Sequence, residues 1–345
     1  MHKFKILILC ARSKELGNGH YSRSKLLKDY LIRKKINSKL LIIHNTKTKK
    51  KNQVYSKEIV SKDFLEKIKS YNYIIFDFSN KKFFKNFIIR KLLIKFSNTF
   101  KKKILIIDSL NQDMLSNDID IKKRFVLCPY FLNYKIKKVK NIKYYLGTRY
   151  FLIRKNRYKY KFRKQVKSII FTSGGSDNFQ STIKFLKIFK SLNIDVNLNI
   201  LIGPMFSKSQ IKEIKKFKEK FFIFKKNKII LKKFKKDLVD NLKGNDIVIS
   251  SSGLTKYEVL QLEIPLIVYS ENSYNYENSK AFYKKKISLN LKNLSNSKYS
   301  KKKILNFIKD SSLRKMYIKK SKKYSNFNGC AMVYKIFVND FKKYN

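Results

Sequence analysis

The sequence predicts an α/β fold with two Rossmann-like domains and an interdomain cleft, and three observations support this prediction. The length of 345 residues exceeds the size at which a single hydrophobic core usually stops growing. Short continuous apolar runs, typical of strands buried on both faces, alternate with longer segments of helical period. The runs form two series separated by a basic segment near Arg154–Lys167, which indicates one parallel, doubly wound sheet for each series.

The predicted strands are the apolar runs themselves. In the first series they are Lys5–Cys10, Ser38–Ile43, Tyr73–Phe78, Lys103–Asp108 and Arg124–Cys128. In the second series they are Ser168–Thr172, Asp195–Ile202, Lys228–Leu231, Asp246–Ser250 and Leu266–Tyr269. Between strands, the helical spacing of Leu26, Leu27, Tyr30 and Leu31 predicts a helix face packed on a sheet. We therefore expect an N-terminal domain over 1–155, a C-terminal domain over 165–335 and a tail over 336–345.

The net charge of +59 suggests, at first, a protein that binds nucleic acid or a membrane surface. However, only 10 of the 82 basic residues are Arg, and the residues in excess are those with A/T-rich codons. Because 43% of the chain is hydrophobic, it can bury a sizeable core. We interpret the charge as coding bias on a solvated surface, and we expect no nucleic-acid partner.

The sequence also bears on location and on cysteine chemistry. No apolar run approaches the length of a membrane span, and the apolar start HKFKILILCA has no small-residue cleavage site. Cys10, Cys128 and Cys330 are far apart and odd in number, which favours buried reduced thiols over disulfides or zinc ligands. We expect a cytoplasmic protein without integral membrane association. Peripheral attachment and the oligomeric state stay open.

Glycine positions mark the expected ligand-binding loops. The chain has only nine Gly, and five of them follow predicted strands in loops that open the next helix: Gly17, Gly19, Gly174, Gly175 and Gly253. In doubly wound sheets, ligands bind beyond the carboxyl ends of the strands. Glycine there permits close approach of the backbone to a ligand.

The loop after the first strand carries the candidate catalytic residue, His20. At a helix N-terminus the dipole disfavours imidazolium, so His20 would be neutral and able to accept a proton. Arg23, one turn later, would lie on the same side and could contact a phosphate or a carboxylate. The alternative interpretation is a surface His beside a Gly turn, followed by a solvated Arg.

The loop that opens the second series is Thr172-Ser173-Gly174-Gly175-Ser176-Asp177. Its successive N–H groups can form an anion-binding nest, to which the Ser hydroxyls add donors. The alternative is an ordinary turn between strand and helix, with Asp177 as the helix N-cap.

A small-residue loop, Ser250-Ser251-Ser252-Gly253, follows a later strand and precedes a helix. This loop can hold a diphosphate, and Glu258 could accept hydrogen bonds from ribose hydroxyls. Alternatively, Thr255 and Glu258 form a Thr-x-x-Glu capping box. Asn275 and Asn278 lie in a polar segment after the next strand, and their amides could line a sugar site.

Together these motifs resemble the GT-B superfamily and, within it, the UDP-sugar hydrolases of pseudaminic acid biosynthesis. The resemblance extends from Ile6 to Phe282. Its motifs are Arg12, Gly17-x-Gly19-His20-x-x-Arg23, Asp77, Asp108, Leu146–Arg154, Gly174–Asp177 and Ser252-Gly253-Leu-Thr255-x-x-Glu258. The family's Asn-Gln pair has no literal match here, and the nearest alignment puts Tyr274 and Asn275 at those positions. The loop between Arg12 and Gly17 also lacks the usual Asp.

The resemblance implies release of UDP from UDP-2,4-diacetamido-2,4,6-trideoxy-β-L-altropyranose or a related nucleotide sugar, without metal or cofactor. His20 would act as general base on water attacking the anomeric carbon. The implied substrate-binding residues are Arg12, Gly17, Gly19, Arg23, Asp77, Gly174, Gly175, Ser176, Asp177, Ser252, Gly253, Thr255, Glu258, Asn275 and Asn278. The alternative is a GT-B glycosyltransferase with a UDP-sugar donor, in which a sugar hydroxyl replaces water. A basic nucleic-acid-binding protein, with Lys and aromatic residues interleaved over Arg157–Arg163, is a third hypothesis.

Overall fold

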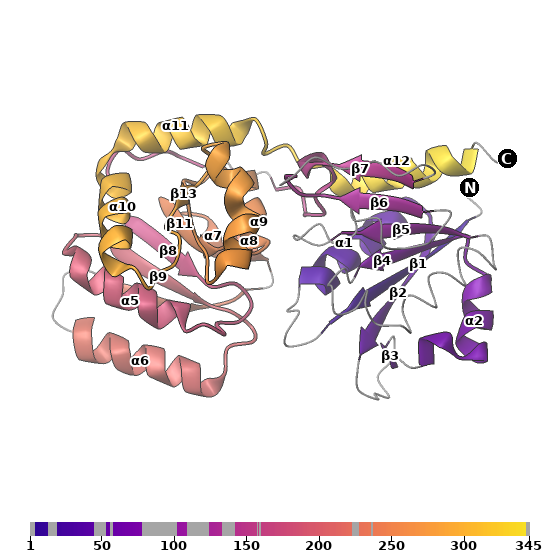
Figure 1. The fold of residues 1–345 in the computed structure, drawn as a ribbon, viewed down its shortest axis with the longest axis horizontal. Coiled ribbons are helices and arrows are strands. Elements are labelled where there is room, and N and C mark those ends of the chain that lie inside the picture. The colour runs from indigo at the N-terminus through magenta and orange to yellow at the C-terminus, as the bar shows by residue number, and fades with distance from the viewer. Residues whose placement is uncertain are drawn as a thin grey trace. The chain divides into compact units, whose positions relative to one another are not determined.

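The computed structural model describes residues 4–12, 19–44, 53–55, 58–77, 102–108, 124–132, 142–156, 158, 160–222, 228–235 and 237–342. The chain divides into two compact units (Figure 1). The first comprises Met1–Lys155 together with Phe327–Asn345, and the second comprises Asn156–Asn326.

The first unit is built on a fully parallel sheet of order β3-β2-β1-β4-β5-β6-β7. Its strands are β1 (Lys5–Ala11), β2 (Asn37–His44), β3 (Gln53–Tyr55), β4 (Tyr73–Asp77), β5 (Lys103–Ile107), β6 (Arg124–Cys128) and β7 (Ile142–Leu146). Its described helices are α1 (Gly19–Arg33), η1 (Glu58–Val60), α2 (Lys62–Lys69), η4 (Thr148–Tyr150) and α12 (Gly329–Lys342). Helix α1 buries Leu27 and Leu31 in the core, as its apolar spacing predicts.

The C-terminal helix α12 belongs to the first unit, and this corrects the expected domain limits of 165–335 and the expected tail at 336–345. Its apolar residues recur at helical spacing, and Val333 and Phe337 are fully buried in the first unit's core. Helix α12 packs against α1. Asp340 adds an ion pair, with its carboxylate 2.6 Å from the Lys103 amine. An apolar helix stripe must be buried against some partner, and here that partner is the first sheet.

The second unit repeats the same topology, with a parallel sheet of order β10-β9-β8-β11-β12-β13. The strands are β8 (Ser168–Thr172), β9 (Asn197–Ile202), β10 (Ile229–Lys233), β11 (Ile247–Ser251), β12 (Leu266–Tyr269) and β13 (Leu289–Asn290). The helices are α5 (Ser181–Leu192), α6 (Lys208–Phe222), α7 (Leu238–Leu242), α8 (Thr255–Leu262), α9 (Ser273–Lys284), α10 (Ser297–Lys309) and α11 (Ser311–Lys322). Stacked aromatic rings lie in its core. The centroid of the Phe171 ring is 4.3 Å from that of Phe185 and 5.3 Å from that of Tyr269.

All ten predicted strands form, and both sheets have the strand order 3-2-1-4-5-6 of a Rossmann fold, extended in the first unit by β7. The α/β fold with two Rossmann-like domains is therefore confirmed. Three strands were not predicted: β3 and β13, which are very short, and β7, which is only partly buried at the edge of its sheet. Such strands lack the continuous apolar run on which the prediction depends. The interdomain cleft stays a prediction.

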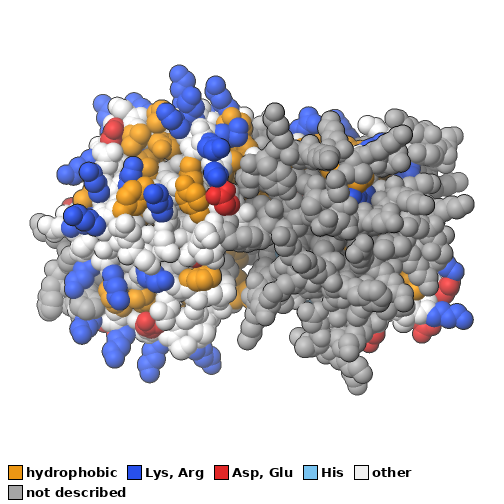
Figure 2. All heavy atoms as spheres, in the orientation of Figure 1, with side chains coloured by type: hydrophobic (Ala, Val, Ile, Leu, Met, Phe, Trp, Pro, Cys, Tyr) orange, Lys and Arg blue, Asp and Glu red, His pale blue; other side chains and the backbone are white. Residues whose placement is uncertain are grey.

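Three further findings concern the surface, membrane-spanning helices and the thiols. Lys and Arg side chains are scattered over the described surface of the second unit, with hydrophobic side chains in small groups between them (Figure 2). Within the described ranges, no helix is both long and apolar enough to cross a membrane. The three cysteines are buried and unpaired, as predicted.

Candidate functional site

The first candidate site lies where the strand order of the first sheet reverses, between β1 and β4. Parallel register pairs Cys10 with Asp77, so both strands end at the same edge of the sheet. Helix α1 begins just beyond this edge at Gly19 and presents His20 and Arg23 to the end of β4. Ligands of doubly wound sheets bind at this switch point.

Asp77 is a fully buried carboxylate that forms hydrogen bonds with three side chains of α1. His20 Nδ1 lies 2.8 Å from Asp77 Oδ1. The Nε atom of Arg23 donates to Oδ1 at 2.9 Å and to Oδ2 at 2.8 Å, and a second guanidinium nitrogen also contacts Oδ1. Ser24 Oγ donates to Oδ2 at 2.7 Å. Asp77 therefore orients the first two turns of α1 toward the sheet.

This network determines the protonation state of Asp77. Burial alone would raise the pKa of Asp77, but the adjacent Arg23 guanidinium and the His20 imidazole hold it well below its ordinary value. The carboxylate is therefore ionised and accepts the hydrogen bond. Two acceptor atoms would repel at 2.8 Å, so Nδ1 of His20 donates the hydrogen bond to Asp77. A guanidinium nitrogen of Arg23 lies 3.1 Å from the same Nδ1.

The arginines of this region have different environments. Arg23 is 6% exposed, and its guanidinium contacts the Asp77 carboxylate and the hydroxyl of Tyr130, which is itself buried. Arg23 was expected to contact either a phosphate or a carboxylate. In the structure it contacts a carboxylate, that of Asp77. Arg12 is exposed and lies 5.0 Å over the Tyr21 ring. Gly17 lies outside the described residues.

In the second unit, the loops after β8, β9 and β11 pack together at the carboxyl edge of the sheet. The Ser251 hydroxyl donates to the Ser173 carbonyl at 3.2 Å and joins the β8 and β11 loops. Gly174 has a φ of +92°, a left-handed conformation that favours glycine. A Cβ at Gly203, after β9, would lie 2.2 Å from the Gly174 carbonyl oxygen, so only glycine permits this contact. Gly175 and Ser176 continue the β8 loop and are partly exposed.

Asp177 caps helix α5. Its two carboxylate oxygens accept the backbone N–H groups of Ser181, at 2.7 Å, and Thr182, at 2.9 Å. The Asp177 side chain is buried. Its two hydrogen bonds agree with the alternative interpretation, in which Asp177 caps the helix, although Gln180 occupies the N-cap position itself. Two of the first-turn N–H groups that an anion would use, those of Ser181 and Thr182, are already satisfied by Asp177.

The capping box proposed for Thr255 and Glu258 does not form. Helix α8 begins at Thr255, so Thr255 lies inside the helix, and Leu254 is the N-cap. Ser252 is buried and Gly253 partly exposed just before the helix. Glu258 is also partly exposed, and burial, with a smaller contribution from Asp237, raises its pKa to about 7. Its carboxyl group therefore stays available to a ligand hydroxyl.

Glu271 organises the polar segment after β12. Asn275 Nδ2 donates to Glu271 Oε2 at 2.9 Å, and the backbone N–H of Asn275 donates to Asn272 Oδ1, the N-cap of α9. Burial and the nearby charge of Asp177 raise the pKa of Glu271 to about 7. Asn278 is half-buried farther along α9. Asn275 is thus directed to Glu271 in this structure.

Sequence reasoning assigned no role to several residues that build these sites: Ser24, Tyr130, Lys256 and Glu271. Glu271 lies two residues after the end of a predicted strand, and that position was a usable signal. Ser24 and Tyr130 act through contacts between distant segments, which no local pattern records. Lys256 is one of 72 Lys and carries no signal in the sequence.

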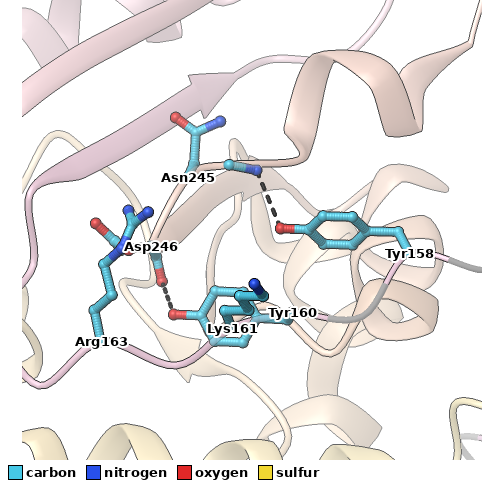
Figure 3. A pocket seen from close by; sticks show the side chains of 7 residues that line it. Tyr158, Tyr160, Lys161, Arg163, Asn245 and Asp246 are labelled. Atoms are coloured by element: carbon cyan, nitrogen blue, oxygen red, sulfur yellow. Dashed lines mark hydrogen bonds and ion pairs between the residues drawn. The ribbon is translucent and has the colours of Figure 1, made fainter.

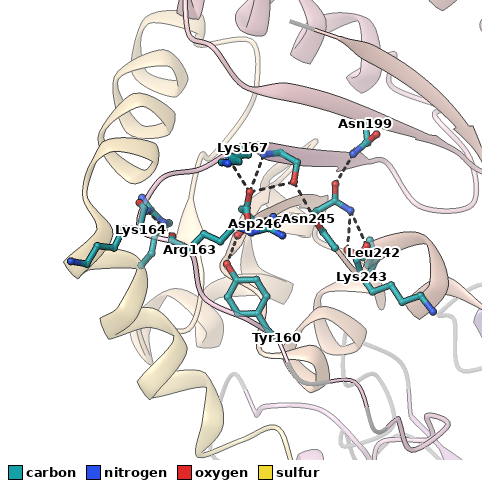
Figure 4. A network of polar contacts seen from close by, with 12 residues as sticks. Tyr160, Arg163, Lys164, Lys167, Asn199, Leu242, Lys243, Asn245 and Asp246 are labelled. Atoms are coloured by element: carbon teal, nitrogen blue, oxygen red, sulfur yellow. Dashed lines mark hydrogen bonds and ion pairs between the residues drawn. The ribbon is translucent and has the colours of Figure 1, made fainter.

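A pocket lies at the opposite, amino edge of the second sheet and is lined by Tyr158, Tyr160, Lys161, Arg163, Gly244, Asn245 and Asp246 (Figure 3). Asp246 accepts the backbone N–H groups of Lys167 and Ser168 at 2.8 and 2.9 Å and pairs with Arg163 at 3.1 Å (Figure 4). Tyr160 donates to the Asp246 carbonyl. These contacts fasten the segment that enters the second unit, and we interpret the pocket as structural.

No family model matches the chain. A segment of 141 residues is 31% identical to the uncharacterized protein MJ1062 of Methanocaldococcus jannaschii and covers 39% of this chain and 28% of that protein. This chain therefore matches less than a third of that relative's length.

Solved structures resemble the chain over almost its whole length. Acinetobacter baumannii MurG covers 96% of this chain and 98% of its own at 12% identity, with a TM-score of 0.65. Anabaena Alr3699/HepE, in complex with UDP and glucose, covers 98% and 100% at 11% identity, with a TM-score of 0.60. The glycotransferase of kitacinnamycin covers 97% and 99% at 9% identity, with a TM-score of 0.55. At these identities the likeness establishes the fold, which is the GT-B type with two Rossmann-like domains.

Proposed function

We propose that this chain is a glycosyltransferase that moves a sugar from a UDP-sugar donor to a hydroxyl group of an acceptor. The observation that carries the proposal is the hydrogen bond between His20 and the ionised, buried Asp77 at the switch point of the first sheet. Further support comes from the shared fold of Alr3699/HepE, which binds UDP and glucose, and of the kitacinnamycin glycotransferase.

In the proposed reaction, His20 is the general base. Asp77 accepts a hydrogen bond from Nδ1 and stays ionised, and Nε2 takes the proton of the acceptor hydroxyl as its oxygen attacks the anomeric carbon. The bond between that carbon and the diphosphate oxygen breaks, and UDP leaves with the electron pair. General base catalysis of this kind contributes roughly 10²–10⁴ in rate.

The second unit supplies the proposed donor site. The loops at Gly174 and Gly253 lie at the carboxyl edge of the sheet, where a diphosphate would bind. The Gly174 N–H itself donates to Thr172 Oγ1 at 3.1 Å, so the Gly253 N–H is the proposed donor to the diphosphate. The N-terminus of α8 adds the positive end of a helix dipole, which stabilises the charge of the leaving UDP. Glu258 would accept hydrogen bonds from the ribose hydroxyls.

Hydrolysis is the second candidate, and the motif Gly17-x-Gly19-His20-x-x-Arg23 favours it. Water would then replace the acceptor hydroxyl at His20, and a UDP-sugar such as UDP-2,4-diacetamido-2,4,6-trideoxy-β-L-altropyranose would yield UDP and free sugar. The same donor-binding residues serve both reactions.

The test is UDP release from a panel of UDP-sugars, with and without acceptor sugars. Acceptor-dependent release supports the transferase, whereas free sugar formed in equal amount with UDP supports hydrolysis. His20→Ala should lower either rate by roughly 10²–10⁴, because the base is lost. A His20→Ala rate near that of the wild type removes His20 from catalysis, and wild-type protein that neither binds nor turns over any UDP-sugar overturns both functions.

A further inference from the structure

Lys256 stands apart from the solvent-exposed lysines of this chain because it is completely buried. It lies in the first turn of α8, with its amine 5.5 Å from the Tyr257 ring centre and 5.4 Å from that of Phe282. The amine donates a hydrogen bond to the Ser252 carbonyl. Among the described residues, no carboxylate forms an ion pair with it.

Such a position is energetically unfavourable. Removing an ammonium group from water without a paired carboxylate is costly, and burial lowers the pKa of Lys256 to about 7. The A/T-rich coding bias explains Lys on the surface, where solvation is retained. It does not explain Lys in the interior, so a structural or functional reason is needed at this position.

The contact with Ser252 orients the peptide that joins Ser252 to Gly253. The described chain has no cis peptide bonds, and the C=O and N–H of a trans peptide point in opposite directions. Because the Ser252 carbonyl points inward to Lys256, the Gly253 N–H points away from the interior. The residue before this peptide, Ser251, is also held in place, because its hydroxyl donates to the Ser173 carbonyl.

We propose that Lys256 is a positioning residue that holds the Ser252–Gly253 peptide so that the Gly253 N–H faces the diphosphate of the bound nucleotide. The inference rests on the proposed function, because it assumes a UDP site at this loop. Lys256 itself does not contact the ligand. Lys256 should therefore increase the affinity for the diphosphate group and leave the affinity for the nucleoside unchanged.

The experiment compares UDP with uridine, which lacks the diphosphate, by isothermal titration calorimetry. Lys256→Met keeps the apolar stem but removes the donor, and it should weaken UDP binding by about tenfold, the effect of one lost, well-placed hydrogen bond. Uridine affinity should stay unchanged. Lys256→Gln retains an N–H donor and should recover part of the UDP affinity. Lys284→Met, at an exposed site on α9, removes the same charge and should bind UDP as the wild type does.

The outcomes separate the two proposals. If the wild type binds neither ligand, the proposed function fails and this inference with it. If the wild type binds UDP and Lys256→Met binds it equally well, only the inference fails. Equal weakening of UDP and uridine makes Lys256 merely structural and also overturns it. Thermal unfolding is measured first, and if Lys256→Met does not fold, the same comparison of ligands is made with Lys256→Gln.

Discussion

At the scale of single residues, burial gives similar groups different roles. Asp77 is fully buried, but the Arg23 guanidinium and the His20 imidazole hold its pKa below the ordinary value, so it stays ionised and accepts a hydrogen bond from His20 Nδ1. Among the described residues no cation pairs with Glu258, and burial raises its pKa to about 7. One carboxyl group therefore stays ionised throughout the physiological range, whereas the other titrates within it.

The raised pKa of Glu258 predicts a pH-dependent nucleoside affinity. The ionised carboxylate is the better acceptor for ribose hydroxyls, so uridine should bind more tightly as pH rises from 6 to 8, through a pKa of about 7. Uridine avoids the phosphate ionisation of UDP in this range. In Glu258→Gln the affinity should be lower at pH 8 and independent of pH, as measured by calorimetry. A wild-type affinity that does not change with pH would contradict the ribose role.

At the scale of elements, three loops at the edge of the second sheet are packed backbone to backbone. Gly203 touches the carbonyl groups of Gly174 and Gly175, and Met205 donates its N–H to the Gly175 carbonyl at 2.9 Å. The proposed diphosphate loop therefore depends on a glycine that comes from a different strand and contacts no ligand in the proposal.

Gly203→Ala should disturb this packing. The new Cβ would lie 2.2 Å from backbone, which cannot be accommodated without a shift, so we expect a loss of about 1–3 kcal/mol of stability together with weaker UDP binding. Gly244→Ala is the control, since its φ of +83° makes alanine strained but no atom lies within 4 Å. That variant should lose stability alone. Urea unfolding and UDP titration measure the two effects, and unchanged UDP affinity in Gly203→Ala would refute the coupling.

At the scale of the molecule, the chain leaves the first unit, forms the second and returns to complete the first. The return brings Gly329 against the backbone of Phe151, where a Cβ would lie 2.3 Å from the Phe151 carbonyl oxygen. Helix α12 then fills the first unit's core with Val333, Ile336 and Phe337. Residues from both ends of the chain thus share one core.

Truncating α12 side chains should destabilise the first unit. Phe337 is fully buried, with its ring 4.9 Å from that of Tyr73, so Phe337→Ala should cost about 3–5 kcal/mol of unfolding free energy. Lys335→Ala, exposed on the same helix, should change it by less than about 0.5 kcal/mol. Denaturant unfolding checks both values. A neutral Phe337→Ala would restore the interpretation of 336–345 as a tail.

The sequence by itself determined the fold class, the ten principal strands and the loops that carry the candidate site, because apolar period and glycine placement are local signals. Only the tertiary structure decided what each side chain in those loops contacts. It directed Arg23 to Asp77, Asp177 to the N-terminus of α5, Lys256 to the Ser252 carbonyl, and α12 to the first sheet. The physical reason is that burial and hydrogen bonding join residues distant in sequence, and in a chain with 72 Lys local composition cannot distinguish a solvated cation from a buried one.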